Sequence, residues 1–299
     1  MNIVIIGNNY FGPILTKQLS EYDTVNSYIF YDTNSKIIDK IKFILNIFKI
    51  DVVYSLSASV SGGGALNLAL KSNKKIVQHF IGSDVLGAVE DYKRGNINQQ
   101  LIKNSTFLCE VDWIAKELKE IDIYAKIQTY CIIENSDRCE LPKSFSILTY
   151  LGKGKEEFYG VNTLIELANK LKDIEFRVAG IDTYSVVLPK NITLLGWVDM
   201  RKELQNSVCY IRNASHDGLA FSVVEALSLG RYVFRNYKFP YTMYFENLTE
   251  LADKIAQKKR LFDDSKLQIH TEAIDFVKSK FNKEKVLGNL VKVLTESKK

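Results

Sequence analysis

Residues 210–235 have the sequence YIRNASHDGLAFSVVEALSLGRYVFR, and this stretch decides how the rest of the chain is interpreted. The apolar run 208–211 predicts a buried strand, which a polar turn follows. The apolar-periodic segment from Phe221 to Leu229 predicts a helix that ends at Gly230, in the place of a C-cap. A β-rich run at 232–235 completes a βαβ unit. Because the turn of such a unit lies at the carboxyl edge of a parallel sheet, the sequence predicts a ligand site there.

Two acids bracket this turn. Asp217 stands just before the predicted helix, and Glu225 is expected within its first turn. The backbone amides expected to face the same point, ready for an anion, are those of Leu219, Ala220 and Phe221. Another interpretation is a capping box, Ser222-Val-Val-Glu225, in which the glutamate only accepts a hydrogen bond from a backbone N–H. The pattern alone leaves both interpretations open.

Residues 217–230, DGLAFSVVEALSLG, resemble the EGFGLPVLEAMA(x)G signature of retaining nucleotide-sugar glycosyltransferases of the family 4 type, which have the GT-B fold. The resemblance implies that Glu225 holds the ribose hydroxyls of the nucleotide. It also implies that Asp217, Gly218 and the following amides hold the transferred sugar and the diphosphate. The family usually has glutamate where this chain has Asp217.

Strands and helices alternate along the first 80 residues, which predicts an α/β fold with a parallel sheet. A chain of 299 residues is long enough for two domains with separate cores. The resemblance implies two Rossmann-like domains that face each other across a cleft. We expect an acceptor-side domain at 1–140 and a nucleotide-sugar-binding domain at 141–299, joined near the polar stretch 134–143. The last helix is expected to pack back on the amino-terminal domain.

The segment 152–160, GKGKEEFYG, resembles the G-R-x(n)-K-G element in which two cations neutralise the donor diphosphate. Lys153 falls in the arginine position, Tyr159 replaces the second cation, and Lys155 is a nearby substitute. The alternative is that both lysines are ordinary solvated loop residues. The residues that correspond to the family's wall around the nucleotide base are Trp197 and Val198.

The resemblance is looser in the amino-terminal half. Gly7 and Gly12 flank the first strand-to-helix loop, which the family places against the diphosphate; a tight turn is the other interpretation. Residues 78–84, QHFIGSD, are similar to the family's H-G-S-D cleft motif, with Ile81 in the histidine position. Since residues two apart share a strand face, His79 is a candidate to approach the transferred sugar. A buried, hydrogen-bonded histidine is the alternative.

The segment 36–49 has an apolar stripe with several lysines around it. Its stripe consists of Ile37, Ile41, Ile44 and Phe48, with Phe43 and Ile47 off the stripe. A helix on a membrane surface has this composition. A Rossmann helix that packs the stripe on the core is the more ordinary interpretation.

Composition narrows the class of protein. Apolar residues make up 46% and charged residues 25%, as in an ordinary globular protein, and the net charge of +5 is too diffuse to predict nucleic-acid binding. It is compatible with an anionic membrane surface or a phosphorylated substrate. The four cysteines form no CxxC pair, so we expect reduced thiols and a cytoplasmic protein, peripheral to a membrane at most. Residues 1–7 predict a strand and not a signal peptide.

The resemblance therefore implies a retaining glycosyltransferase of the hexosyltransferase type. It would move a sugar from a nucleotide-diphosphate donor to a glycan, lipid-linked or small-molecule acceptor, with no further cofactor. No D-x-D spacing occurs, so Lys153 and backbone amides are expected to neutralise the leaving group without a metal ion. The departures at Tyr159, Ile81 and Asp217 leave a catalytically degenerate binding subunit as an alternative. A nucleotide-sugar isomerase of the same fold is a third candidate, and it would need acid–base groups beyond His79.

Overall fold

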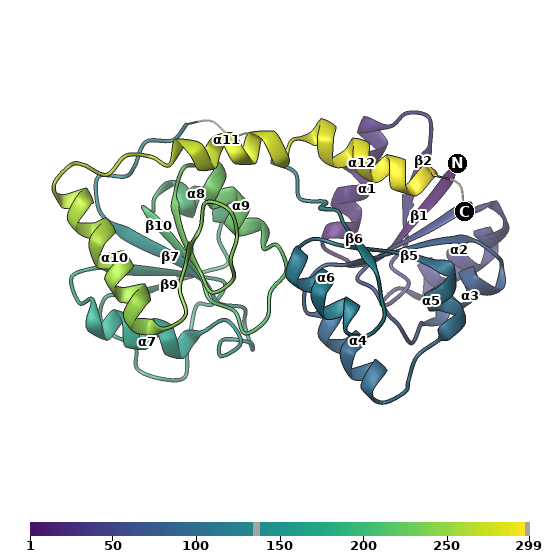
Figure 1. Cartoon of the computed structure of the whole chain (residues 1–299), viewed down its shortest axis with the longest axis horizontal. Helices are drawn as coiled ribbons and strands as arrows, with labels where there is room; N and C mark the ends of the chain where they lie inside the picture. Colours follow the sequence, from purple (N-terminus) through teal and green to yellow (C-terminus); the bar gives the residue numbers. More distant parts are fainter. Residues whose placement is uncertain (134–137, 297–299) are drawn as a thin grey trace. The chain divides into compact units, whose positions relative to one another are not determined.

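The computed structural model describes residues 1–133 and 138–296 of the chain (Figure 1). It consists of two compact units. Unit 1 comprises Met1–Ile132 and Lys283–Lys299, and unit 2 comprises Ile133–Asn282. The polar stretch at 134–143, interpreted above as a linker, lies partly outside the described residues, because 134–137 are not among them.

Unit 1 is built on a sheet of six parallel strands in the order β2-β1-β3-β4-β5-β6. The strands are β1 (Asn2–Gly7), β2 (Ser27–Phe30), β3 (Val52–Leu56), β4 (Lys75–Phe80), β5 (Ser105–Cys109) and β6 (Ala125–Ile127). Strand β3 is buried along its whole length, as expected for a central strand with helices on both faces.

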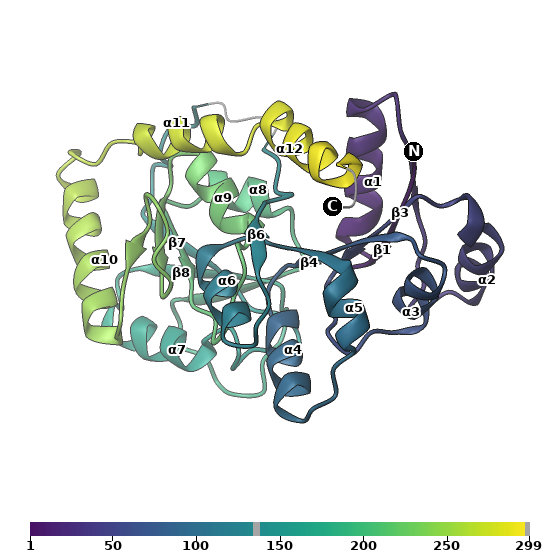
Figure 2. The ribbon, with the colours of Figure 1, turned by 45° about the vertical axis from the view of Figure 1, so that its right-hand side comes forward.

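Helices cover the sheet of unit 1. They are α1 (Phe11–Tyr22), α2 (Ile37–Asn46), the short 3₁₀ helix η1 (Ile47–Lys49), α3 (Gly64–Lys71), α4 (Asp84–Lys93), α5 (Gln99–Asn104), α6 (Asp112–Lys119) and α12 (Lys283–Thr295). Figure 2 shows α12 beside α1, which it contacts. The ammonium of Lys75, at the start of β4, donates hydrogen bonds to the carbonyls of Val293, Leu294 and Glu296 at 2.7, 3.0 and 2.5 Å. A cation thus satisfies the carbonyl groups at the end of α12.

Unit 2 has a second sheet of six parallel strands, in the order β12-β11-β10-β7-β8-β9. Its strands are β7 (Ser146–Tyr150), β8 (Glu175–Ala179), β9 (Ile192–Gly196), β10 (Cys209–Arg212), β11 (Tyr232–Arg235) and β12 (Met243–Tyr244). Its helices are α7 (Val161–Lys170), α8 (Met200–Gln205), α9 (Phe221–Ser228), α10 (Leu248–Asp263) and α11 (Thr271–Lys280).

Both units are therefore Rossmann-like, and the predicted α/β class with two such domains is confirmed. In each sheet, the strands that come early in the chain are added on one side of the first strand, and later strands are added on its other side. The switch point lies between β1 and β3 in unit 1 and between β7 and β10 in unit 2. Ligands of open α/β sheets bind at such points, outside the carboxyl ends of the strands.

The apolar stripe of α2 and η1 does not pack on the core. The four residues expected to be buried, Ile37, Ile41, Ile44 and Phe48, are all exposed. Phe43 and Ile47, which lie off the stripe, are the residues that join the core of unit 1. The prediction of a core-facing stripe was wrong, because helical periodicity identifies an apolar face without saying what covers it.

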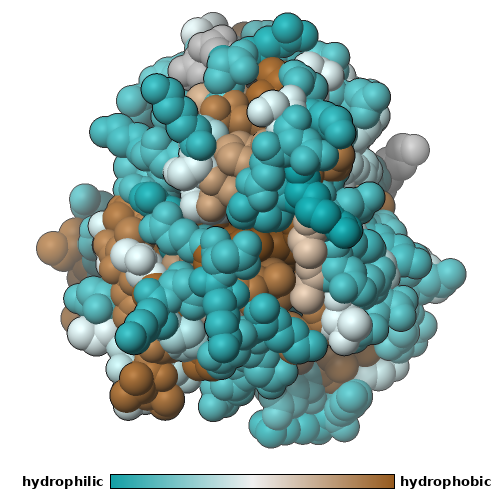
Figure 3. Space-filling view, turned by 90° about the vertical axis from the view of Figure 1, so that its left-hand side faces the viewer, coloured by the Kyte–Doolittle hydropathy of each residue, from teal (hydrophilic) through white to brown (hydrophobic). Residues whose placement is uncertain are grey.

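The face of the molecule in Figure 3 is mainly hydrophilic, with apolar side chains in separate groups. Within the described part of the chain, no helix is both long and apolar enough to cross a bilayer.

Candidate functional site

The switch point of unit 2 brings together the two loops that the sequence singled out. One loop follows β7 and runs from Leu151 to Gly160; the other follows β10 and runs from Asn213 to Ala220. The chain leaves β7 toward β8 and leaves β10 toward β11, in opposite directions across the sheet. Right-handed crossovers then carry the chain that follows each loop to opposite faces of the sheet, and ligands of open α/β sheets bind where this happens.

The two loops contact each other directly. The amide of Ser215 donates to the carbonyl oxygen of Phe158 at 2.8 Å. Gly160 has a φ of +78°, and a Cβ atom there would lie 2.5 Å from the side-chain nitrogen of Asn213. Glycine is thus required both by the backbone conformation and by the close approach of the loops.

A buried cluster of charges lies beneath the loops. The Arg212 guanidinium donates from Nε to Oδ2 of Asp217 at 2.8 Å and from Nη2 to Oδ1 at 2.9 Å. Arg235 donates from Nη2 to Oδ2 of the same carboxylate at 3.2 Å. Burial lowers the pKa of both arginines and is the largest single influence on each. For Arg212, the hydrogen bonds and the charge of Asp217 together outweigh burial, so its pKa is raised. For Arg235 they do not, so its pKa is lowered. Two arginines and one aspartate give the cluster a formal charge of +1.

This cluster changes the interpretation of Asp217. Both of its carboxylate oxygens are engaged by guanidinium groups, and its side chain is only 10% exposed. The family resemblance implied that this acid holds a sugar, and it implied no role for Arg212 or Arg235. A signal was present, since each arginine ends an otherwise apolar strand, a place where a charge needs a partner.

Arg212 also lies against the loop after β7. Its guanidinium carbon lies 4.7 Å from the centre of the Tyr159 ring and 5.8 Å from that of Tyr150. Tyr159 occupies the position at which the sequence comparison lacked a second cation. A fixed positive charge is therefore present directly behind that tyrosine, supplied by a residue of another strand.

Glu225 is the fifth residue of α9 and so lies in its second turn, not in the first as expected. The capping-box interpretation is also wrong. The N-cap residue is Ala220, for which no side-chain capping bond is found, and the hydroxyl of Ser222 instead lies 2.8 Å from that of Tyr210. The helix begins one residue before Ser222, so this serine cannot cap it.

The Glu225 carboxylate is half-buried, and among the described residues no group forms a hydrogen bond with it. Burial raises its pKa; the nearby charge of Arg201 opposes this shift, and that of Asp199 adds to it. Both charged residues belong to the start of α8, where Asp199 is the N-cap. A half-buried acid without a hydrogen-bond partner is costly in a structural role and available for a ligand.

The predicted base-binding residues lie between β9 and α8, just before the N-cap residue Asp199. Trp197 is 78% exposed, Val198 is half-buried, and both directly precede Asp199. The structure thus brings the predicted base-side and ribose-side residues to neighbouring positions in unit 2, with the charge of Asp199 acting on Glu225.

The loop before α9 offers free backbone donors. Within the described residues, the amides of Leu219 and Ala220 donate no hydrogen bond, and Phe221 is the first residue of the helix. Ala220 has a φ of +54°, an uncommon conformation for a residue with a side chain. Arg235 holds this loop by donating to the carbonyl oxygens of Gly218 and Leu219. The amides of Leu219 and Ala220 can therefore donate to an anion at this end of α9.

Lys153 and Lys155 project from an exposed turn of the other loop. The turn is held by its own backbone: the amide of Lys155 donates to the carbonyl oxygen of Gly152 at 2.9 Å, and that of Gly154 to the Glu156 carboxylate at 2.9 Å. Neither lysine side chain takes part in these bonds. Both ammonium groups are therefore available to a ligand of this loop, and their exposure fits a solvated role equally well.

Three of the predicted residues, Gly7, Gly12 and His79, belong to unit 1. A Cβ atom on Gly7 would lie 2.0 Å from the carbonyl oxygen of Leu56, and Gly7 has a φ of +104°. A Cβ atom on Gly12 would lie 2.3 Å from the Phe30 ring. Close packing accounts for both glycines, and the positive φ at Gly7 fits the tight-turn interpretation, whereas Gly12 lies within α1.

His79 is fully buried in unit 1. Its Nδ1 lies 2.7 Å from the hydroxyl of Tyr54, and its ring packs edge-on against that of Tyr130. Burial lowers its pKa to about 3. A neutral imidazole without exposed atoms is suited to packing and not to proton transfer at neutral pH, so the structure favours the buried-histidine interpretation.

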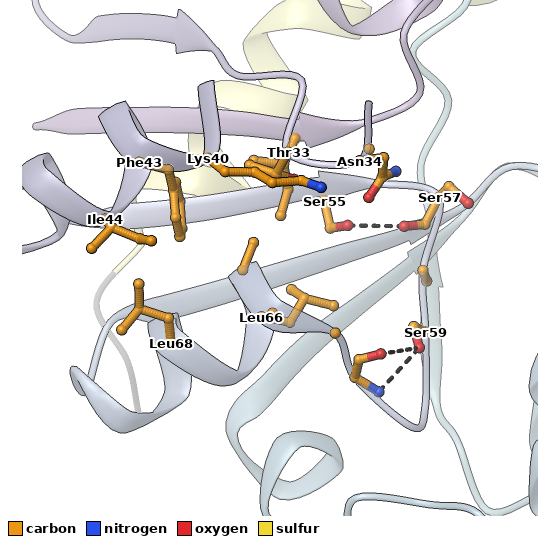
Figure 4. A pocket seen from close by; sticks show the side chains of 17 residues that line it. Thr33, Asn34, Lys40, Phe43, Ile44, Ser55, Ser57, Ser59, Leu66 and Leu68 are labelled. Carbon is orange, nitrogen blue, oxygen red and sulfur yellow. Dashed lines mark hydrogen bonds between the residues drawn. The ribbon is translucent and has the colours of Figure 1, made fainter. Parts of the chain in front are cut away.

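Unit 1 contains a cavity of about 510 Å³ at its own switch point. Figure 4 shows Lys40, from α2, with its amine directed toward the hydroxyl-bearing residues after β2 and β3. Gly62, Gly63 and Gly64 lead into α3 on another wall. The polar lining residues are Thr33, Asn34, Lys40, Ser55, Ser57 and Ser59, and the large apolar ones are Ile6, Phe43, Ile44, Leu66 and Leu68. The cavity has the size and mixed lining of a small-molecule site.

No protein-family model matches the chain, and no curated protein matches it in sequence. Several solved structures share its fold. Sucrose-phosphate synthase from Thermosynechococcus elongatus superposes with a TM-score of 0.70 at 10% identity, over 98% of both chains. WaaG, a glycosyltransferase involved in lipopolysaccharide biosynthesis, gives 0.65 at 11% identity, over 99% of this chain and 100% of WaaG.

TarM from S. aureus, solved with UDP, fondaparinux and α-GlcNAc-glycerol, gives a TM-score of 0.62 at 13% identity and covers 82% of this chain. The chain spans about half the length of TarM and of the pneumococcal transferase GtfA, 55% and 56% respectively. All of these neighbours are glycosyltransferases of the GT-B fold, and at such low identity the likeness establishes the fold.

Proposed function

We propose that the chain is a glycosyltransferase that binds a nucleotide-diphosphate sugar at the switch point of unit 2. The observation that carries the proposal is the Glu225 carboxylate, which is half-buried and has no hydrogen-bond partner among the described residues. A ribose offers two adjacent hydroxyl donors, which match the two oxygens of a carboxylate. The TarM and GtfA structures, which share the fold, contain UDP.

The remaining residues of the site fit the other parts of such a donor. The amides of Leu219 and Ala220 and the ammonium of Lys153 would neutralise the diphosphate, with Lys155 as a further cation. Trp197 and Val198 would form the apolar wall for the base. Positive charge that is in place before the bond breaks stabilises the departing diphosphate without reorganisation.

We assign Asp217 a positioning role. Because its carboxylate is occupied by Arg212 and Arg235, it orients these guanidinium groups and need not contact the sugar. The cluster keeps a formal charge of +1 next to Tyr159. Arg212 would thereby supply the second cation that the loop after β7 lacks.

This arrangement favours a reaction that needs no metal ion, because the protein itself provides the cations. The likeness of residues 217–230 to the family 4 signature supports retention of the anomeric configuration. The four cysteines are all free thiols, which fits a reducing compartment such as the cytoplasm.

The cavity of unit 1 is our candidate for the acceptor. It combines hydroxyl groups, the Lys40 ammonium and an apolar wall, so an acceptor with both an anionic and an apolar part fits its lining. His79 has no role in this proposal, because its ring is fully buried and neutral at ordinary pH.

A binding subunit without transferase activity is the second candidate. It is favoured by the engagement of Asp217 and by the burial of His79, which leave fewer reactive groups than expected. The isomerase alternative is weakened by the same histidine, since its pKa of about 3 removes the acid–base group on which it depended.

The test is a thermal-shift screen against nucleotide diphosphates and their sugar conjugates, followed by a measurement of donor hydrolysis or transfer. A ligand that binds the native state raises the melting temperature by mass action. Stabilisation with turnover supports the transferase, and stabilisation without turnover supports the binding subunit. If no nucleotide stabilises the protein, the assignment of the unit 2 site is overturned.

A further inference from the structure

Helix α2 and η1 carry an apolar face that is turned to solvent. Six large apolar side chains of this segment are 51–86% exposed: Ile37, Ile38, Ile41, Ile44, Leu45 and Phe48. Phe43 and Ile47, at 1% and 3% exposure, anchor the segment to unit 1. Single exposed apolar residues are ordinary, but a contiguous group on one element marks an interaction site.

Lysines border this apolar face on both sides. At about 100° per helical residue, the six apolar side chains fall within an arc of about 120°. Lys40 lies along one edge, Lys42 and Lys49 lie along the other, and Lys36 precedes the helix as its N-cap; all four are exposed. The one acid of the segment, Asp39, accepts a hydrogen bond from a backbone amide and is half-buried. The exposed charge of the face is therefore entirely positive.

We propose that the α2–η1 face docks on an anionic membrane surface. Its apolar side chains would enter the boundary between headgroups and acyl chains, and its lysines would contact the lipid phosphates. The segment is far too short to span a bilayer, so it would lie along the surface. A second copy of the chain is disfavoured as the occupant, because a symmetric contact would bring the two sets of lysines together.

The position of the unit 1 cavity also indicates which class of acceptor the protein would use, an inference that rests on the proposed transferase function. Lys40 and Ile44 line the cavity and also belong to the docking face or its border (Figure 4). A polar headgroup whose apolar tail is anchored in the same membrane could therefore enter the cavity beside α2. The acceptor would be lipid-borne and carry an anionic group for Lys40.

Docking is tested by sedimentation of the full chain with vesicles, without donor or acceptor. We expect binding to vesicles of phosphatidylcholine mixed with phosphatidylglycerol, and much weaker binding to pure phosphatidylcholine. The triple variant Ile38→Ser, Leu45→Ser, Phe48→Ser should bind more than tenfold more weakly. None of these three residues lines the cavity.

A matched control changes three equally exposed apolar residues elsewhere: Val25→Ser, Tyr124→Ser and Val187→Ser. This variant should bind vesicles like the wild type. A second test variant, Lys36→Gln, Lys42→Gln, Lys49→Gln, should lose roughly fivefold in affinity per lysine at low salt. Added salt should also weaken the binding of the wild type, because it screens the attraction between the lysines and the lipid phosphates.

The proposal is overturned if the wild type ignores anionic vesicles or if the serine triple variant binds them unchanged. It is also overturned if the wild type is a dimer in solution that this variant dissociates, since a second copy would then cover the face. Circular dichroism shows whether each variant remains folded.

The acceptor class is tested separately, by supplying a sugar-labelled donor together with a membrane extract. Label in the organic-soluble fraction supports a lipid-borne acceptor. If label is transferred only to water-soluble products, the inference of a lipid-borne acceptor is contradicted and the docking inference is unaffected. If no donor is consumed while vesicles are still bound, the proposed transferase function fails and the docking inference stands.

Discussion

The carboxylate of Asp217 is clamped by Arg212, five residues earlier in the chain, through two hydrogen bonds of 2.8 and 2.9 Å. Arg235, on the neighbouring strand β11, adds a third contact at 3.2 Å. This cluster joins the ends of β10 and β11 to the loop that precedes α9. The position of that loop therefore depends on charges buried beneath it.

Asp217→Asn should destabilise the protein strongly. The substitution leaves two buried guanidinium groups without a compensating charge, and breaking a buried pair in this way costs roughly 3–5 kcal/mol. Urea unfolding measures the change. Asp112→Asn, which breaks the largely exposed pair with Lys116, is the control and should cost about 0–1 kcal/mol. Equal effects of the two substitutions would show that the cluster does not hold the loop.

Glu225→Gln should leave the fold intact and weaken donor binding. A hydrogen bond to a charged group contributes roughly 1.5–3 kcal/mol, and we expect a loss of donor affinity in that range. Calorimetry or a thermal shift with nucleotide measures it. Glu157→Gln, at an exposed position of the loop after β7, serves as the control. Unchanged affinity in a folded Glu225→Gln protein would remove the main support for the donor site.

The pH dependence of Glu225 should have opposite signs for stability and for binding. Burial raises its pKa above the ordinary 4.5. Its contribution to the stability of the free protein is therefore fully present below the pKa that Glu225 has in the unfolded chain. That contribution is lost as the pH rises through the pKa that Glu225 has in the folded protein. Ribose binding needs the ionised carboxylate, so donor affinity should fall as the pH falls through the same range. Parallel titrations of the wild type and Glu225→Gln test this, because the variant should lack both effects.

A chelator should leave transfer or donor hydrolysis essentially unchanged. In the proposed site, Lys153, the Arg212 cluster and the amides before α9 provide the positive charge that the leaving diphosphate needs. The measurement compares initial rates with and without EDTA, with magnesium or manganese added back. Activity that disappears with the chelator and returns with either metal would contradict the proposal.

Local patterns were enough to predict the elements of the fold. The alternation of β-branched runs with apolar-periodic segments predicted a parallel sheet in the first part of the chain, and the family resemblance implied two Rossmann-like domains; the structure confirms both. The loop between β10 and α9 was also placed correctly, because strand, turn and helix succeed one another within about two dozen residues.

The limits of such patterns are visible at Glu225. The spacing of Ser222 and Glu225 fits a capping box, yet α9 begins at Phe221 and the serine hydroxyl lies beside that of Tyr210. The residue at which a helix begins depends on the conformation of the preceding loop. That loop passes through a positive φ at Ala220, which neither periodicity nor propensity indicates.

The sequence by itself determined which segments are strands and helices, since apolar periodicity and glycine positions act over a few residues. The tertiary structure alone decided which side chains are buried and which charges are paired. Strand order brings Arg212 and Arg235 to one carboxylate, encloses His79 between Tyr54 and Tyr130, and leaves the stripe of α2 in solvent. The physical reason is that burial and ion pairing depend on neighbours distant in sequence, which only the crossovers of the two sheets bring together.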